Sequence, residues 1–228
     1  MTISSFLREL QGSRVEGELL KTVFYSLLTS FVLVGILYFV KLRAVPDFLS
    51  KYGFFLFLAI ISYALMLPSL RHTRAYRALP CMAGMMVGMT TGMLAGFLSA
   101  FYVAATNGMF VGSVFGMLIG MLLGAWNGKC CGIMGIMEAL MAGFMGALMG
   151  AMTAFMLLND NLRAASLIVL AVSAVILFSL HYLIYKEMEG GERQLHEDNV
   201  LTMIMSLILT TLTIWLMVYG PRTGVFAS

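Results

Sequence analysis

Charged residues divide this chain into long apolar segments, and most of these segments have the length of a membrane span. Residues 22–40 and residues 52–70 each form a run of 19 residues without Asp, Glu, Lys or Arg, close to the roughly 20 that cross the hydrocarbon core as a helix. The uncharged segment 78–128 has 51 residues. It is long enough for two spans that turn at residues 106–108, where the sequence Thr-Asn-Gly favours a turn.

Three further segments complete the pattern. Residues 130–159 contain one acid, Glu138, and no base, while residues 164–185 and 199–220 contain no charged residue. The pattern predicts an all-α polytopic membrane protein of about seven transmembrane helices. The predicted parts are an amphipathic leader (1–18), helices one and two (19–77), helices three to five (78–159), and helices six and seven (160–228) with an acidic loop at 186–198.

Composition agrees with a protein that has lipid as its solvent. Hydrophobic residues make up 61% of the chain and charged residues 11%, and the mean hydropathy is +0.94, whereas a soluble domain has about a quarter charged residues. A water-soluble fold is excluded, because its surface would be too small to cover so large an apolar core. The net charge of +3 is typical of a membrane protein with basic inner loops, so we expect the lipid bilayer, and no nucleic acid, as a partner.

Lys and Arg in the loops predict the orientation. With a cytoplasmic N-terminus, the inner segments carry nine of these residues and the outer segments carry five. The N-terminus is therefore predicted to be cytoplasmic and the C-terminus to lie on the other side.

Glycine recurs at every fourth position in the predicted helices three and four. A four-residue period places small residues on one helix face, where a neighbouring backbone can approach closely. We expect helices three to five to pack as a tight unit with these glycines inward and the other helices around it. The predicted packing glycines are Gly84, Gly88, Gly92, Gly96, Gly108, Gly112, Gly116, Gly120 and Gly124.

Methionine is concentrated in the same three helices, which hold 15 of the 21 methionines. A thioether is an uncharged soft ligand, so a row of Met side chains offers Cu(I) or Ag(I) successive coordination sites without a buried charge. The alternative is that Met fills irregular gaps beside the glycines. Local motifs around Met85, Met89 and Met93 resemble those of the Ctr copper transporters, which combine MxxxM and GxxxG in membrane helices. Ctr proteins have three spans and an outward N-terminus, so the resemblance is one of motifs.

The three cysteines and Glu138 add to this chemistry. Cys81 opens helix three, and Cys130 and Cys131 join helices four and five, so a helical hairpin brings them to one membrane side. On the predicted cytoplasmic side, free thiols are expected rather than disulfides. Glu138, the only acid within a span, can neutralise a cation or take up a proton. His181 is a possible partner of Glu138, or an interfacial histidine.

The leading prediction is therefore a membrane protein that binds or transports a soft metal ion such as Cu(I). Its candidate ligands are Met85, Met89, Met93, Met117, Met121, Met134, Met137, Met141, Met145, Met149, Cys81, Cys130, Cys131 and Glu138. The alternative is a structural subunit of a larger membrane complex, or a homo-oligomeric channel, packed through glycine zippers. An enzyme is not expected, because the sequence has no HExxH motif, no Ser/His/Asp set and no pair of carboxylates within the spans.

Overall fold

The computed structural model describes residues 15–40, 52–75, 80–187 and 199–221, and the regular structure in these ranges is helical. Within these ranges, seven long helices follow one another. They are α2 (Val15–Val40), α3 (Phe54–Ala75), α4 (Cys81–Asn107), α5 (Met109–Gly128), α6 (Gly132–Met156), α7 (Leu162–Glu187) and α8 (Asn199–Tyr219), with short 3₁₀ turns η3 (Lys129–Cys131) and η4 (Leu157–Asn159) before and after α6.

The described ranges contain six stretches that are long and apolar enough to cross a membrane. One of them, Met109–Asn159, has 51 residues and includes both α5 and α6, which fold back on each other at η3. As one straight helix it would be about 77 Å long, more than twice the thickness of the hydrocarbon core. The seven predicted helices are therefore all present, and the all-α polytopic membrane fold is confirmed.

Most helix ends agree closely with the predicted segments, and the start of α2 is the exception. α4 ends at Asn107 and α5 begins at Met109, and Gly108 between them has a positive φ of 111°, which glycine adopts without steric cost. Gly108 thus forms the expected turn rather than a helix contact. α2 begins at Val15, earlier than predicted. The rest of the predicted leader (1–14) and the loop at 188–198 lie outside the described residues.

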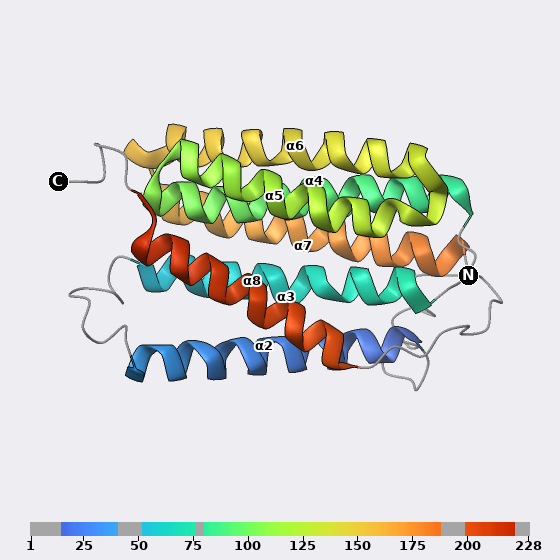
Figure 1. Ribbon diagram of the computed structural model, residues 1–228, viewed down its shortest axis with the longest axis horizontal. Coiled ribbons are helices and arrows are strands. Elements are labelled where there is room, and N and C mark those ends of the chain that lie inside the picture. Colours follow the sequence, from blue (N-terminus) through green and yellow to red (C-terminus); the bar gives the residue numbers. More distant parts are fainter. Residues whose placement is uncertain (1–14, 41–51, 76–79, 188–198, 222–228) are drawn as a thin grey trace.

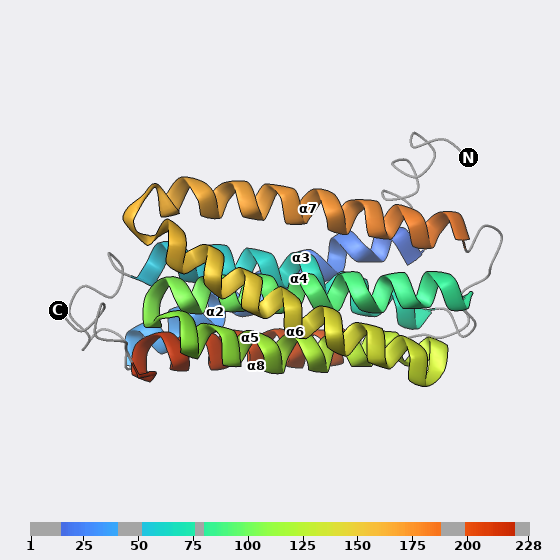
Figure 2. The same ribbon diagram turned by 90° about the horizontal axis from the view of Figure 1, so that it is seen from above.

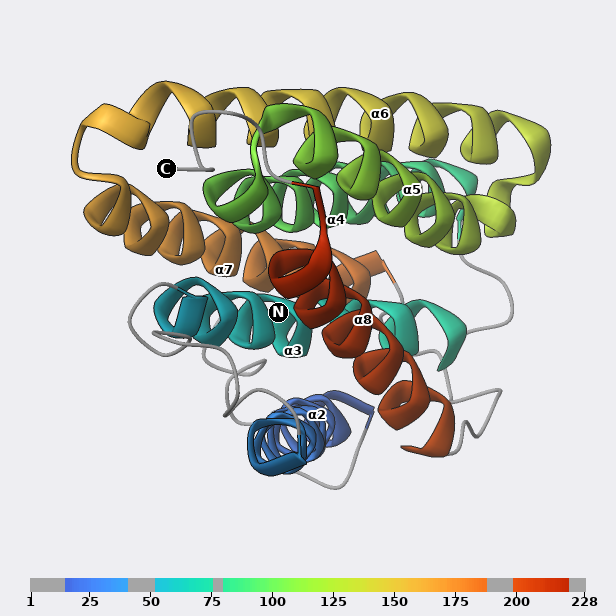
Figure 3. The same cartoon turned by 60° about the vertical axis from the view of Figure 1, so that its left-hand side comes forward.

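The helices run along the long axis of the molecule and form two groups (Figure 1). α4, α5 and α6 pack against one another at one side, and α2 and α8 lie at the other (Figure 3). α3 contacts α2, α4, α7 and α8 and so connects the groups. α6 and α7 are joined at one end and diverge toward the other (Figure 2).

Glycine and alanine lie where α4, α5 and α6 touch. A Cβ placed on Gly116 of α5 would be 2.5 Å from the Ala100 Cβ and 2.7 Å from the Gly96 oxygen of α4. A Cβ on Gly143 of α6 would be 2.6 Å from the Gly120 carbonyl carbon. Side chains at these positions would hold the helices apart, so the close backbone approach depends on their absence.

The three-helix unit is not surrounded by the other helices, contrary to expectation. α6 packs mainly against α4 and α5, and its opposite face is exposed, with Met141 at 59% and Phe144 at 45%. Small residues on one face suffice for α6 to join the unit, which leaves the other face exposed.

Polar side chains connect the helices across the rest of the bundle. Ser30 of α2 lies 2.8 Å from Ser206 of α8, and Tyr63 of α3 lies 3.0 Å from Thr213 of α8. Asn127 of α5 receives a hydrogen bond from Thr73 of α3 at 3.2 Å and donates to Thr91 of α4 at 3.1 Å. In lipid, where apolar burial does not drive helix association, such bonds and close packing stabilise the bundle.

Candidate metal centre

α6 separates two kinds of residue onto opposite faces. Its buried residues are all Gly or Ala, and its methionines lie on the other face. The exposed fractions of the five predicted methionine ligands on this helix run from 50% at Met145 to 63% at Met134. We call the following set the α6 methionine row: Met134, Met137, Met141, Met145, Met149, Met152 and Met156.

Glu138 lies within this row. It is four residues after Met134 and three before Met141, and these spacings place all three on one helix face. Its side chain is half-buried, and its Cα is six residues into α6, about 9 Å along the helix axis. The only acid of the span therefore has thioethers on both sides and faces away from the helix contacts.

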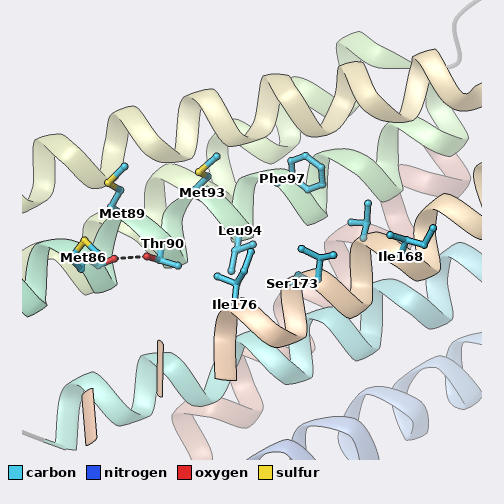
Figure 4. A pocket seen from close by; sticks show the side chains of 11 residues that line it. Met86, Met89, Thr90, Met93, Leu94, Phe97, Ile168, Ser173 and Ile176 are labelled. Atoms are coloured by element: carbon cyan, nitrogen blue, oxygen red, sulfur yellow. Dashed lines mark hydrogen bonds between the residues drawn. The ribbon is translucent and has the colours of Figure 1, made fainter. Parts of the chain in front are cut away.

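α4 carries a second, shorter row of methionines that borders a groove. Met86, Met89 and Met93 line one wall of the α4–α7 groove, and residues of α7 line the other (Figure 4). The groove has a volume of about 430 Å³. Its α7 wall consists of Ile168, Val169, Val172, Ser173 and Ile176. We call Met86, Met89 and Met93 the α4 methionine row.

The hydroxyl groups at this groove are engaged in their own helices. Thr90 donates to the Met86 carbonyl oxygen at 2.6 Å, and Ser173 donates to the Leu170 carbonyl oxygen at 2.8 Å. The hydroxyl hydrogens are therefore already bonded, and the three thioether sulfurs are the soft donor atoms among the residues that line the groove.

The structure modifies the predicted α4 set. Met86, which was not among the candidates, shares the exposed face with Met89 and Met93, whereas Met85 is half-buried. The spacing of three and four residues along one face was the available signal for Met86. On α5, Met117 and Met121 are also half-buried.

The packing of α4, α5 and α6 leaves no room for a Met-lined path between these helices. Gly92 of α4, Gly124 of α5 and Ala139 of α6 meet there, and a Cβ on Gly92 would lie 2.9 Å from the Ala139 oxygen and 3.1 Å from the Gly124 Cα. The methionine rows therefore lie on the outer faces of the unit.

The cysteines correct the expectation of three free thiols. Cys81 at the start of α4 and Cys131 of η3 form a disulfide, with their Cα atoms 5.0 Å apart. Cys130 is a free, exposed cysteine next to this bridge. In this disulfide-bonded form, the described residues contain no group of three or more His, Cys, Asp or Glu placed to hold a metal ion.

His181 pairs with a residue that the sequence did not indicate. Its Nδ1 lies 3.1 Å from Nδ1 of His72, so one ring donates its proton and the other accepts it. The pair joins α3 to α7 inside the bundle. His181 therefore pairs with a histidine of another helix rather than with Glu138.

No family model, curated protein or solved structure matches this chain. The chemistry of the chain's own residues therefore has to indicate the function, above all the two methionine rows, Glu138 and the cysteines.

Proposed function

We propose that this integral membrane protein binds a soft monovalent metal ion, Cu(I) or Ag(I), and passes it along the methionine rows of α6 and α4. The observation that supports the proposal is the α6 methionine row, seven thioethers on the face away from the helix contacts with Glu138 among them.

The placement of the row argues against Met as a filler of gaps. A filler side chain occupies irregular space at a packed interface, but the α6 contacts are made by Gly and Ala. Simple contact with lipid does not require sulfur either. On the neighbouring α5, the most exposed positions are Phe110, Leu118 and Leu122. A purely lipid-facing α6 would be served equally well by such residues.

The chemistry of the row suits a soft cation. Met residues three or four positions apart are neighbours on a helix surface, so an ion can exchange one thioether for the next along the helix. The ligands are uncharged, and the Glu138 carboxylate supplies one negative charge to offset the charge of the ion.

The structural-subunit alternative is weakened by the location of the glycines. Gly92, Gly116 and Gly124 are occupied by contacts within the chain, so they do not form a free surface for a partner. A partner would have to dock on another face of the unit, such as the exposed face of α5 or the α6 methionine row.

The first prediction tests the thioethers of the row. Replacing Met141, Met145 and Met149 together by Leu retains size and apolarity at exposed positions, so folding should be unaffected. Mutation of residues that merely support metal ligands commonly costs about 10–100-fold in affinity. Because this variant removes three ligands, we expect Ag(I) or Cu(I) uptake into proteoliposomes to fall by at least about tenfold. Glu138→Gln, added to the triple variant, should reduce uptake further because it removes the compensating charge.

A matched control replaces three methionines outside the rows, Met109, Met203 and Met205, by Leu. This control variant should transport like the wild type. Monodisperse elution of all variants verifies folding. Equal uptake by the wild type and the Met141/Met145/Met149 variant would refute the proposal and identify the row as a lipid-facing or docking surface.

A further inference from the structure

The three cysteines of the chain gather at one end of the α4–α5–α6 unit. Cys81 is the first residue of α4, and Cys130 and Cys131 lie in η3, the turn between α5 and α6. The Sγ of Cys131 is bonded to that of Cys81 and lies 3.1 Å from the Cys81 carbonyl oxygen. The bridge thus joins two points that are 50 residues apart in the sequence.

Cys130 lies against the same turn of α4. A Cβ placed on Gly84, one helical turn after Cys81, would be 3.5 Å from the Cys130 Cβ and 4.0 Å from the Cys131 Cβ. Because Gly84 has no side chain, it leaves space beside both cysteines of η3. Cys130 is also exposed, so the location is accessible from outside the protein.

We propose that these cysteines form a redox-gated binding site for a soft monovalent cation, closed by the Cys81–Cys131 disulfide and opened by its reduction. The proposal deepens the soft-metal function and rests on it. In the oxidised form only Cys130 offers a thiol, and one thiolate alone is a weak site. After reduction, Cys81 and Cys131 add two thiolates, which gives three soft ligands at one place.

The opening step is a thiol–disulfide exchange with a dithiol reductant. One thiolate of the reductant attacks a sulfur of the bridge and forms a mixed disulfide, and the first cysteine leaves as a thiolate. The second thiol of the reductant then displaces the other cysteine. Two electrons and two protons pass to Cys81 and Cys131, and the dithiol becomes a disulfide. Binding of the cation to the three sulfurs releases their protons.

The geometry allows the reduced sulfurs to share one ion. The Cα atoms of Cys81 and Cys131 are 5.0 Å apart, and Cys130 is adjacent to Cys131 in the chain, with its Cα about 3.8 Å away. The three side chains therefore start from neighbouring backbone positions, from which rotation about their Cα–Cβ bonds would bring the reduced sulfurs toward a common centre.

The test compares Cu(I) binding by the full-length protein in its oxidised and reduced forms. Detergent-solubilised protein is treated with a dithiol, or left oxidised, then desalted and titrated with Cu(I) without oxygen against a chromogenic Cu(I) chelator. We expect the reduced form to hold one Cu(I) per chain more tightly than the chelator does, and the oxidised form to lack this equivalent. The reverse treatment, reoxidation before titration, should remove it again.

Two cysteine variants separate the ligands from the bridge. Cys130→Ser retains the disulfide, and in the reduced form it should bind the added Cu(I) at least about tenfold more weakly, because one of three ligands is missing. Cys81→Ser cannot form the bridge, so its binding should be the same before and after dithiol treatment. The proposal would be overturned if the oxidised wild type still held one tightly bound Cu(I) per chain. It would also be overturned if reduced Cys130→Ser bound this Cu(I) as tightly as the reduced wild type.

The same titration distinguishes this inference from the proposed function. Met141, Met145 and Met149 belong to α6, away from the cysteines, so their replacement by Leu should leave the reduction-dependent equivalent in place. If the triple Leu variant takes up metal like the wild type and reduction still adds one bound Cu(I), the methionine path fails and the cysteine site stands. If uptake falls but reduction adds no equivalent, the cysteine site fails and the methionine path stands.

Discussion

Gly116→Leu should abolish most of the correctly folded protein. A Cβ at this position would already lie 2.5 Å from the Ala100 Cβ and 2.7 Å from the Gly96 oxygen, and a leucine adds three more carbons. The clash is partly with backbone, which cannot rotate away, so α4 and α5 would have to separate. We expect a destabilisation of more than about 3 kcal/mol. The fraction of monodisperse protein after extraction and its thermal unfolding midpoint measure the effect.

Two control variants isolate the helix contact from general effects of leucine and of α5. Gly35 in α2 has no atom within 4 Å of its added Cβ, so Gly35→Leu should be tolerated, with a gain of up to about 1 kcal/mol in helix propensity. Leu118 on α5 is 55% exposed, and Leu118→Ala should change stability by about 0.5 kcal/mol or less. If Gly116→Leu were as stable as either control, the close contact would not hold this unit together.

The fold was predictable because its determinants are local in the sequence. Charges such as Arg77 and Lys129 limit the apolar segments, and segment length sets the number of spans. The turn at Gly108 was predictable because a positive φ favours glycine. The early start of α2 at Val15 was missed because backbone hydrogen bonding continues past the charged residues that limit the apolar window.

The candidate site was only partly predictable, because it depends on which faces meet. The spacing of Met134, Met141 and Met145 indicates that they share a face, but not whether that face is toward another helix or toward lipid. Their exposure follows from the opposite face of α6, where Gly and Ala allow the closest approach and so decide the contact.

Pairings over long sequence separations were not predictable in the same way. His72 and His181 are 109 residues apart, and Cys81 and Cys131 are 50 residues apart. The sequence placed the three cysteines at one membrane side but could not give the distance between them, and the predicted reducing compartment favoured free thiols. Because the bridge requires an oxidant, its presence raises the question of which compartment this end of the bundle faces, and that can be measured.

The membrane side of the cysteines determines how the bridge is interpreted. With nine Lys and Arg on the side of Cys130 and five on the other, the charge distribution predicts that this end is cytoplasmic. A disulfide in such a compartment is usually transient and redox-sensing, whereas one in an oxidising compartment is usually structural. The orientation of the chain in the membrane therefore bears on the redox-gated site. One labelling experiment measures this orientation directly.

In a variant with Cys81 and Cys131 replaced by Ser, Cys130 should react with a membrane-impermeant maleimide in inside-out vesicles and not in intact cells. Cys130 is exposed, so the reagent can reach it wherever the compartment allows, and the expected contrast is close to all or none. The matched control introduces Asp160→Cys into the cysteine-free chain. Asp160 is exposed in the turn between α6 and α7, at the opposite end of α6, so it should be labelled in intact cells and not in inside-out vesicles. Labelling of Cys130 from outside the cell, with Asp160→Cys protected, would reverse the predicted orientation and place the Cys81–Cys131 bridge in the oxidising compartment.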